Sequence, residues 1–137
     1  MRVTLVTETY TPQVNGVSRT LSHLVQYLRA RGDHVQVVHP NYHIKTDDMD
    51  AVVVPAVTMP FYPDVRVPRP PFGKVHRAIE RFQPDIIHIA TEVTLGFSTL
   101  CFALRSNRPV VSSFHTNFDQ YTSHYQVGWA GGLIWRY

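Results

Sequence analysis

The sequence alternates between short apolar runs rich in β-branched residues and longer segments with helical periodicity. Five apolar runs lie at residues 2–7, 34–39, 51–54, 85–90 and 109–114. Runs of this length, such as RVTLVT and DIIHIA, are typical of strands that are buried on both faces. Because parallel strands need crossover segments between them, the alternation predicts a Rossmann-like, doubly wound α/β fold with a mainly parallel sheet.

Three segments between the apolar runs have apolar residues three or four positions apart. This spacing predicts amphipathic helices over residues 17–28, 72–82 and 93–104. Two stretches depart from the pattern. Residues 46–50 form an acidic loop without helical periodicity, and prolines at 60, 63, 68, 70 and 71 predict a largely extended segment after the third run.

Length and composition exclude several classes of protein. A chain of 137 residues with 44% hydrophobic and 17% charged residues is typical of one folded domain, not of a disordered or fibrous chain. Cys101 is the single cysteine, which excludes an internal disulfide and a cysteine-based metal cage. No His, Asp or Glu spacing favours a metal site. With no signal-peptide pattern after Met1 and no run long enough to span a bilayer, we expect a cytoplasmic chain.

The positive charge is concentrated in one segment, residues 59–77, whose balance of +3 equals the net charge of the whole chain. Its charged residues are Arg66, Arg69, Lys74 and Arg77 against Asp64 alone. Phe61 and Tyr62 lie beside them, a combination typical of peripheral binding to an anionic membrane. A helix that packs on the sheet and leaves its arginines in solvent is the alternative. No stacking or helix-turn-helix pattern favours nucleic acid.

Three segments follow predicted strands, where ligands bind in open α/β sheets: residues 8–19, 90–96 and 115–125. In the first, Gly16 opens a helix whose free N–H groups and dipole favour an anion, and a glycine lets a phosphate approach the backbone. An ordinary turn with Asn15 as N-cap fits the same residues. The dinucleotide glycine fingerprint and the Walker motif are absent, which disfavours an oxidoreductase and a P-loop NTPase.

Histidines and serines near the fifth run are candidates for chemistry. His115 directly follows the run, where an imidazole can donate to a substrate hydroxyl or stabilise charge, although a histidine there can also cap a strand end. His88 lies within an apolar run and is interpreted as a core histidine. Ser112 and Ser113 lack the nucleophile-elbow pattern, so a hydrolase triad is disfavoured.

Three motifs together resemble one family. They are ETYxPxxNGVxR at residues 8–19, PDIIHIATE at 84–92 and SSFHTNFxxY at 112–121. In this order and spacing they resemble the N-terminal part of family-four glycosyltransferases of the GT-B fold, especially bacterial mannosyltransferases and diacylglycerol glycosyltransferases. The resemblance implies retaining transfer of a mannose- or glucose-like sugar from a nucleoside-diphosphate sugar to an acceptor hydroxyl, which can belong to a lipid.

The resemblance also implies roles for individual residues. Gly16 is expected to meet the donor diphosphate through its backbone, with Asn15 beside it and Arg19 as the nearby cation. His115 matches the histidine that faces the transferred sugar, and we treat it as the catalytic candidate. The acceptor-side candidates are Glu92, Thr116 and Asn117. Many relatives carry Gly-Gly where this chain has Asn15-Gly16, which affects the tightness of the diphosphate contact.

Residues 1–137 are therefore expected to form an N-terminal, acceptor-side domain, truncated before a C-terminal nucleotide-sugar domain. The basic donor-phosphate residues and glutamate-rich motif of that second domain have no match here, so the fragment alone is expected to be inactive. The expected partners are a nucleotide sugar, an acceptor, the missing domain and an anionic membrane surface, with no cofactor and no nucleic acid. The expected location is the cytoplasm, peripherally on the inner face of the plasma membrane. The alternative is a stand-alone, non-catalytic Rossmann-like binding module.

Overall fold

The computed structural model describes residues 1–43, 48, 50–59, 62–113 and 115. In this part of the chain the elements follow one another in an order that alternates strands and helices. They are β1 (Arg2–Val6), α1 (Gly16–Ala30), β2 (His34–Pro40), β3 (Ala51–Val54), β4 (Ala56–Met59), β5 (Tyr62–Pro68), α2 (Gly73–Phe82), β6 (Ile86–Ile89), α3 (Thr94–Arg105) and β7 (Val110–Ser112).

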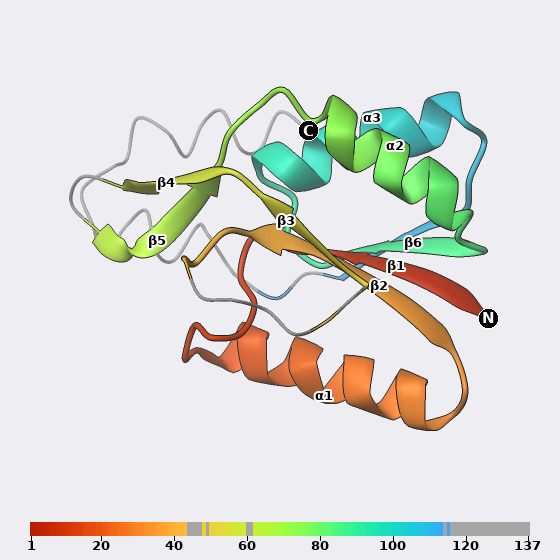
Figure 1. Ribbon diagram of the computed structural model, residues 1–137, viewed down its shortest axis with the longest axis horizontal. Coiled ribbons are helices and arrows are strands. Elements are labelled where there is room, and N and C mark those ends of the chain that lie inside the picture. The colour runs from red at the N-terminus through yellow and green to blue at the C-terminus, as the bar shows by residue number, and fades with distance from the viewer. Residues whose placement is uncertain (44–47, 49, 60–61, 114, 116–137) are drawn as a thin grey trace.

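The main sheet has five strands in the order β3-β2-β1-β6-β7, and every neighbouring pair is parallel. Helix α1 lies on one face of this sheet, and α2 and α3 lie on the other (Figure 1). This is the doubly wound, Rossmann-like α/β fold that the alternating pattern predicted. The strand order reverses between β1 and β6, so the loops after these two strands border the topological switch point.

Two apolar cores, one on each face, explain why the strand sequences are almost continuously apolar. Under α1, Leu21 and Val25 pack with side chains of β1 and β2, including Leu5 and Val37. The opposite core joins the sheet to α2 and α3, and its buried members are Val6, Val38, Val54, Phe72, Val75, Ile79, Ile87, Ile89, Leu95 and Ala103. Each Val, Leu, Ile or Phe side chain among them contributes about 1.5–3 kcal/mol when it leaves water. Alternate residues of β1 therefore serve opposite cores.

The proline-rich segment contains a feature that the sequence analysis did not predict. Strands β4 and β5 pair antiparallel as a separate two-stranded sheet, with Ala56 opposite Pro68 and Thr58 opposite Arg66. The expectation of extended backbone is correct for the described residues, but the pairing was missed. Proline has no backbone N–H and cannot donate a hydrogen bond to a neighbouring strand. A two-stranded sheet tolerates it because each strand has a free edge.

Candidate functional site

Polar residues after β1 and β6 bind the two loops of the switch point to each other. The Glu8 N–H donates to Thr91 Oγ1 at 2.6 Å. The Glu8 carboxylate reaches further, because its Oε1 accepts from the Leu95 N–H at 2.7 Å and from the Gly96 N–H at 3.4 Å. Glu8 thus caps the N-terminus of α3, where Val93 at the N-cap position supplies no side-chain hydrogen bond.

Glu8 has an unusual protonation equilibrium for a carboxylic acid. Burial raises its pKa from 4.5 to about 7, and this effect outweighs the backbone N–H groups of α3, which lower it. The sequence analysis did not single out Glu8 as a functional residue. Its partners on α3 lie 87 residues away in the chain, so only the fold brings them together.

The first turn of α3 also packs tightly on the loop after β6. A Cβ atom at Gly96 would lie 2.0 Å from the carbonyl oxygen of Thr91 and 3.0 Å from Cγ2 of Ile89. No side chain fits at such a distance from backbone. Gly96 therefore allows α3 to approach the loop closely enough for Glu8 to reach its N-terminus.

The N-terminus of α1 differs from that of α3 because it is exposed. Asn15 is its N-cap, and its Oδ1 accepts from the Ser18 N–H at 2.8 Å, as the turn interpretation predicted. Asn15 Nδ2 donates in turn to Thr9 Oγ1 at 2.8 Å. Gly16 is exposed, and a Cβ atom there would meet no atom of the described residues within 4 Å. The first turn of α1 holds no acidic residue and carries the exposed Arg19, so its electrostatics favour an anion.

His115 lies at the end of a short hydrogen-bonded chain. Its Nε2 is 2.8 Å from Ser113 Oγ, and the same hydroxyl is 2.6 Å from His88 Nε2. His115 is exposed and His88 is half-buried. Desolvation lowers the pKa of His88, and the nearby His115 lowers it further. His88 has the hydrogen-bond partner expected of a core histidine, but no pattern in the sequence indicates that this partner also contacts His115.

Ser112 and Glu92 form a second link between the same strand ends, because Ser112 Oγ donates to Glu92 Oε1. Glu92 is exposed in the loop after β6, close to the end of β7. The structure thus brings Glu92 and His115, predicted from different motifs, to the ends of two neighbouring strands. The other two acceptor-side candidates, Thr116 and Asn117, lie outside the described residues.

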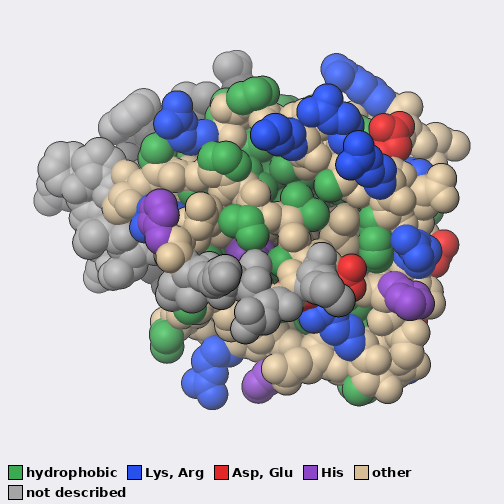
Figure 2. All heavy atoms as spheres, viewed as in Figure 1, with side chains coloured by type: hydrophobic (Ala, Val, Ile, Leu, Met, Phe, Trp, Pro, Cys, Tyr) green, Lys and Arg blue, Asp and Glu red, His purple; other side chains and the backbone are tan. Residues whose placement is uncertain are grey.

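The segment predicted to contact a membrane is divided between the core and the surface. Phe72 and Val75 are buried against the sheet, so the apolar face of α2 belongs to the core and not to a lipid-facing surface. The exposed cations of the segment are Arg69, Lys74 and Arg77. Arg66 is partly buried, and its Nη1 lies 3.2 Å from His43 Nε2. Figure 2 shows Lys and Arg side chains gathered over α2 and α3. Phe61 and the side chain of Tyr62 lie outside the described part.

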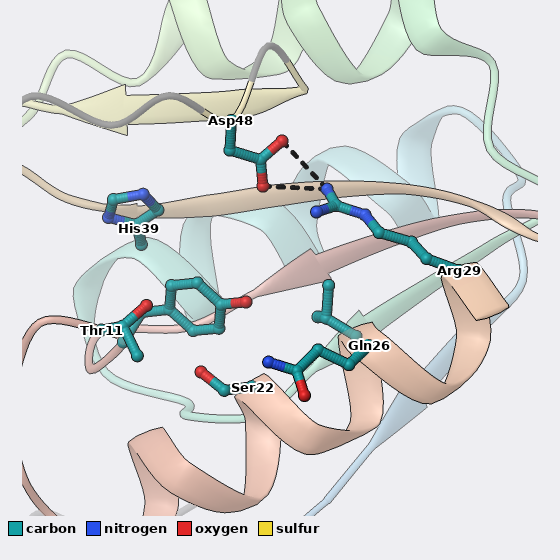
Figure 3. Close-up of a pocket in the computed structure, with 8 residues that line it drawn as sticks. Thr11, Ser22, Gln26, Arg29, His39 and Asp48 are labelled. Carbon is teal, nitrogen blue, oxygen red and sulfur yellow. Dashed lines mark hydrogen bonds and ion pairs between the residues drawn. The ribbon is translucent and has the colours of Figure 1, made fainter.

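A cavity of about 230 Å³ lies between α1 and β2 (Figure 3). Its two charged residues, Arg29 and Asp48, bind each other. Arg29 binds both carboxylate oxygens of Asp48, at 3.0 and 2.9 Å, and donates to the carbonyl oxygen of Val35 at 2.8 Å. His39 in β2 is buried at 6% exposure and stacks on Tyr42 with ring centroids 5.9 Å apart. Burial lowers the pKa of His39.

Within the described ranges, no three His, Cys, Asp or Glu side chains are grouped so that they could hold a metal ion. None of the helices in this part of the chain has the length and apolarity needed to cross a bilayer.

Comparison with known proteins gives consistent matches. The model of a family described as Glycosyltransferase Family 4 matches residues 14–137. A GDP-mannose-dependent alpha-mannosyltransferase of Mycobacterium tuberculosis is 30% identical over 143 residues, which cover 98% of this chain and 37% of the relative. The protein of the same name from Mycolicibacterium smegmatis is 31% identical, over 98% of this chain and 38% of the relative.

A relative with a different name also matches. An alpha-monoglucosyldiacylglycerol synthase of Streptococcus pneumoniae is 31% identical over 130 residues, which cover 93% of this chain and 30% of the relative. The chain thus spans about a third of the length of these curated relatives.

Proposed function

Because the chain belongs to glycosyltransferase family 4, we propose that it is the N-terminal, acceptor-side domain of a longer, retaining glycosyltransferase of the GT-B fold. The reaction moves a mannose- or glucose-like sugar from a nucleoside-diphosphate donor to an acceptor hydroxyl. Two relatives depend on GDP-mannose by their names, which supports this class of donor. The name of the third, a monoglucosyldiacylglycerol synthase, supports a lipid as acceptor.

The observation that carries the proposal is the open N-terminus of α1 at the switch point. Gly16 leaves space beside the backbone. The first turn of α1 holds no acidic residue that would offset the positive end of the helix dipole. Arg19 adds a cation in the same turn. A diphosphate that approaches Gly16 would accept hydrogen bonds from backbone N–H groups and gain from the dipole. His115, at the end of β7, is then the candidate group beside the transferring sugar.

The test is a transfer assay with the full-length protein and a panel of nucleoside-diphosphate sugars, offered with diacylglycerol-type lipids and with soluble hydroxyl acceptors. We expect transfer from at least one mannose or glucose donor, with the anomeric configuration of the donor kept in the product. An NMR spectrum of the product decides the configuration. Inversion contradicts the retaining reaction, and binding of donors without any transfer favours the stand-alone binding module.

A membrane-associated acceptor would need a surface that brings the enzyme to lipid. We propose that the exposed cations Arg69, Lys74 and Arg77 supply it by attraction to anionic head groups, peripherally and on the cytoplasmic side. Because the apolar face of α2 is part of the core, this contribution is electrostatic and should weaken with salt. Sedimentation with anionic vesicles should fall when the three residues are changed to Glu, while binding to zwitterionic vesicles stays low throughout. Equal binding to both vesicle types contradicts this surface.

A further inference from the structure

The hydrogen-bonded chain of His88, Ser113 and His115 follows from the register of two neighbouring strands. His88 in β6 lies opposite Val111 in β7. Side chains on one face of a strand recur every two residues, so Val111 and Ser113 share a face. Ile86 and Ala90, which flank His88 at the same spacing, pack in the core under α1. The three polar side chains therefore meet on the α1 face of the sheet, beyond the carboxyl end of β7.

The Ser113 hydroxyl couples the two imidazole rings. Its oxygen lies within hydrogen-bond distance of Nε2 of both histidines, at 2.6 and 2.8 Å. A hydroxyl has one hydrogen, so it can donate to one ring nitrogen and must accept from the other. The proton position on one ring thus determines the proton position on the other. Two isolated histidines would each exchange between both neutral forms.

We infer that His88 is a positioning residue for His115: acting through Ser113, it fixes the ring orientation and the tautomer of His115. The inference rests on the proposed function, which places His115 beside the transferring sugar. His88 Nε2–H donates to Ser113 Oγ, and the Ser113 hydroxyl donates to His115 Nε2. Neutral His115 then carries its hydrogen on Nδ1, the ring nitrogen that remains for a substrate hydroxyl.

Burial and charge suit His88 to this role. Desolvation and the neighbouring His115 both lower the pKa of His88, which keeps its ring neutral near pH 7. A neutral partner can hold the hydrogen-bond order without placing a cation beside His115. A purely structural role for His88 would need only its hydrogen bond to Ser113. That role does not require Ser113 to form a second hydrogen bond to the exposed imidazole of His115.

Steady-state kinetics of the full-length enzyme test the inference. Ser113→Ala and His88→Leu should each lower kcat about tenfold or more and leave KM within about twofold, because they loosen a catalytic group without removing a substrate contact. His88→Gln should restore most of kcat, since its amide N–H reaches about as far as Nε2 and donates to Ser113. The Ser113→Ala and His88→Leu double variant should lose no more than either single variant. Val111→Ala, on the same face of β7, is the matched control and should keep its kcat.

The tautomer of the His115 ring is a second readout of the positioning role. A general loss of packing would not change it in the same way. Nitrogen-15 shifts of the His115 ring should report the Nδ1–H form in the parent and a mixture of both neutral forms in Ser113→Ala. Parental kcat in both Ser113→Ala and His88→Leu, or an equal loss in Val111→Ala, overturns the positioning role.

His115→Ala separates this failure from failure of the proposed function. If His115→Ala loses about a hundredfold in kcat while the Ser113 and His88 variants are normal, only the positioning role is wrong. If His115→Ala turns over normally, the placement of His115 at the transfer site is itself wrong, and the inference falls with it.

Discussion

The N-termini of α1 and α3 lie at the same edge of the sheet, yet one is open and the other is closed by the protein itself. Both carry a glycine in the first turn, Gly16 in α1 and Gly96 in α3. The free N–H groups of α3 bind the half-buried carboxylate of Glu8. Within the described part of the chain, the side chain of Asn15 is the one that binds an N–H group of α1, and no atom lies within 4 Å of a Cβ placed at Gly16. The comparison indicates that the protein's own carboxylate occupies the N-terminus of α3, whereas the N-terminus of α1 is available to an external anion.

The largest expected effect is on the closed helix. Gly96→Ala puts a methyl group 2.0 Å from the Thr91 carbonyl oxygen, and neither backbone can yield without separating α3 from the loop after β6. We expect a loss of more than about 3 kcal/mol in the free energy of unfolding, or no folded protein at all. Gly16→Ala is the matched control and should unfold within about 1 kcal/mol of the parent, because its Cβ meets nothing. If urea unfolding shows similar stability for Gly96→Ala and Gly16→Ala, the proposed difference between the N-termini of α3 and α1 is wrong.

The next effect concerns the carboxylate that closes α3. The pKa of Glu8 is about 7 in the folded chain against 4.5 for an ordinary glutamate, so the folded state holds this proton more tightly than the unfolded state. Its contribution to the free energy of unfolding is therefore greatest below about pH 4.5, falls as the pH rises to 7 and is constant above that. The total change is about 3 kcal/mol.

Glu8→Gln isolates that contribution. Its amide oxygen can still accept from the Leu95 N–H, but it does not ionise. Between pH 5 and 7 the stability of the variant should fall less steeply than that of the parent, and above pH 7 the variant should be the more stable protein. Urea unfolding over this pH range checks both expectations, and parallel curves would show that Glu8 does not titrate there.

On the open helix, the expected effect is on activity and not on stability. Gly16→Val places a branched side chain where the donor diphosphate would approach the backbone, while its Cβ would contact none of the described residues. Transfer by the full-length enzyme should fall about a hundredfold or more, a loss typical of a removed set of backbone donors. The unfolding temperature should stay within a few degrees of the parent. Normal transfer by a folded Gly16→Val protein would exclude this helix as the diphosphate site.

The sequence predicted both helices, but it predicted the cap of α1 by Asn15 and missed the cap of α3 by Glu8, and the reason is the range of the interactions. Asn15 and Gly16 act within four residues of each other and their partner Ser18, so capping chemistry can be recognised in the sequence. Strands buried on both faces were equally clear, because their apolar runs are continuous. Glu8 and its α3 partners are 87 residues apart, and no local pattern distinguishes Glu8 from an ordinary loop carboxylate.

The same limit applies to the other residues that sequence analysis missed. Ser113 was considered only as a nucleophile, yet in the structure it joins two histidines, one of them in the neighbouring strand. The β4–β5 pairing was hidden because prolines interrupt the alternation that normally indicates a strand. In each case the missing information is which segments become neighbours, which depends on the whole sheet.

The smallest expected effect is at the cap of the open helix. The side chain of Asn15 accepts from the Ser18 N–H and donates to Thr9 Oγ1. Asn15→Ala should cost about 1 kcal/mol in the free energy of unfolding, because one N–H of α1 loses its partner. Asn15→Gly should cost only a few tenths of a kcal/mol, since an N-cap glycine leaves the N–H groups accessible to water.

In the full-length enzyme Asn15→Gly should also keep transfer activity and bind the donor at least as tightly, because it gives a diphosphate more room beside Gly16. Urea unfolding and donor titration together decide the point. Donor binding that weakens more in Asn15→Gly than in Asn15→Ala would mean that flexibility at this position harms the site more than the loss of the side chain.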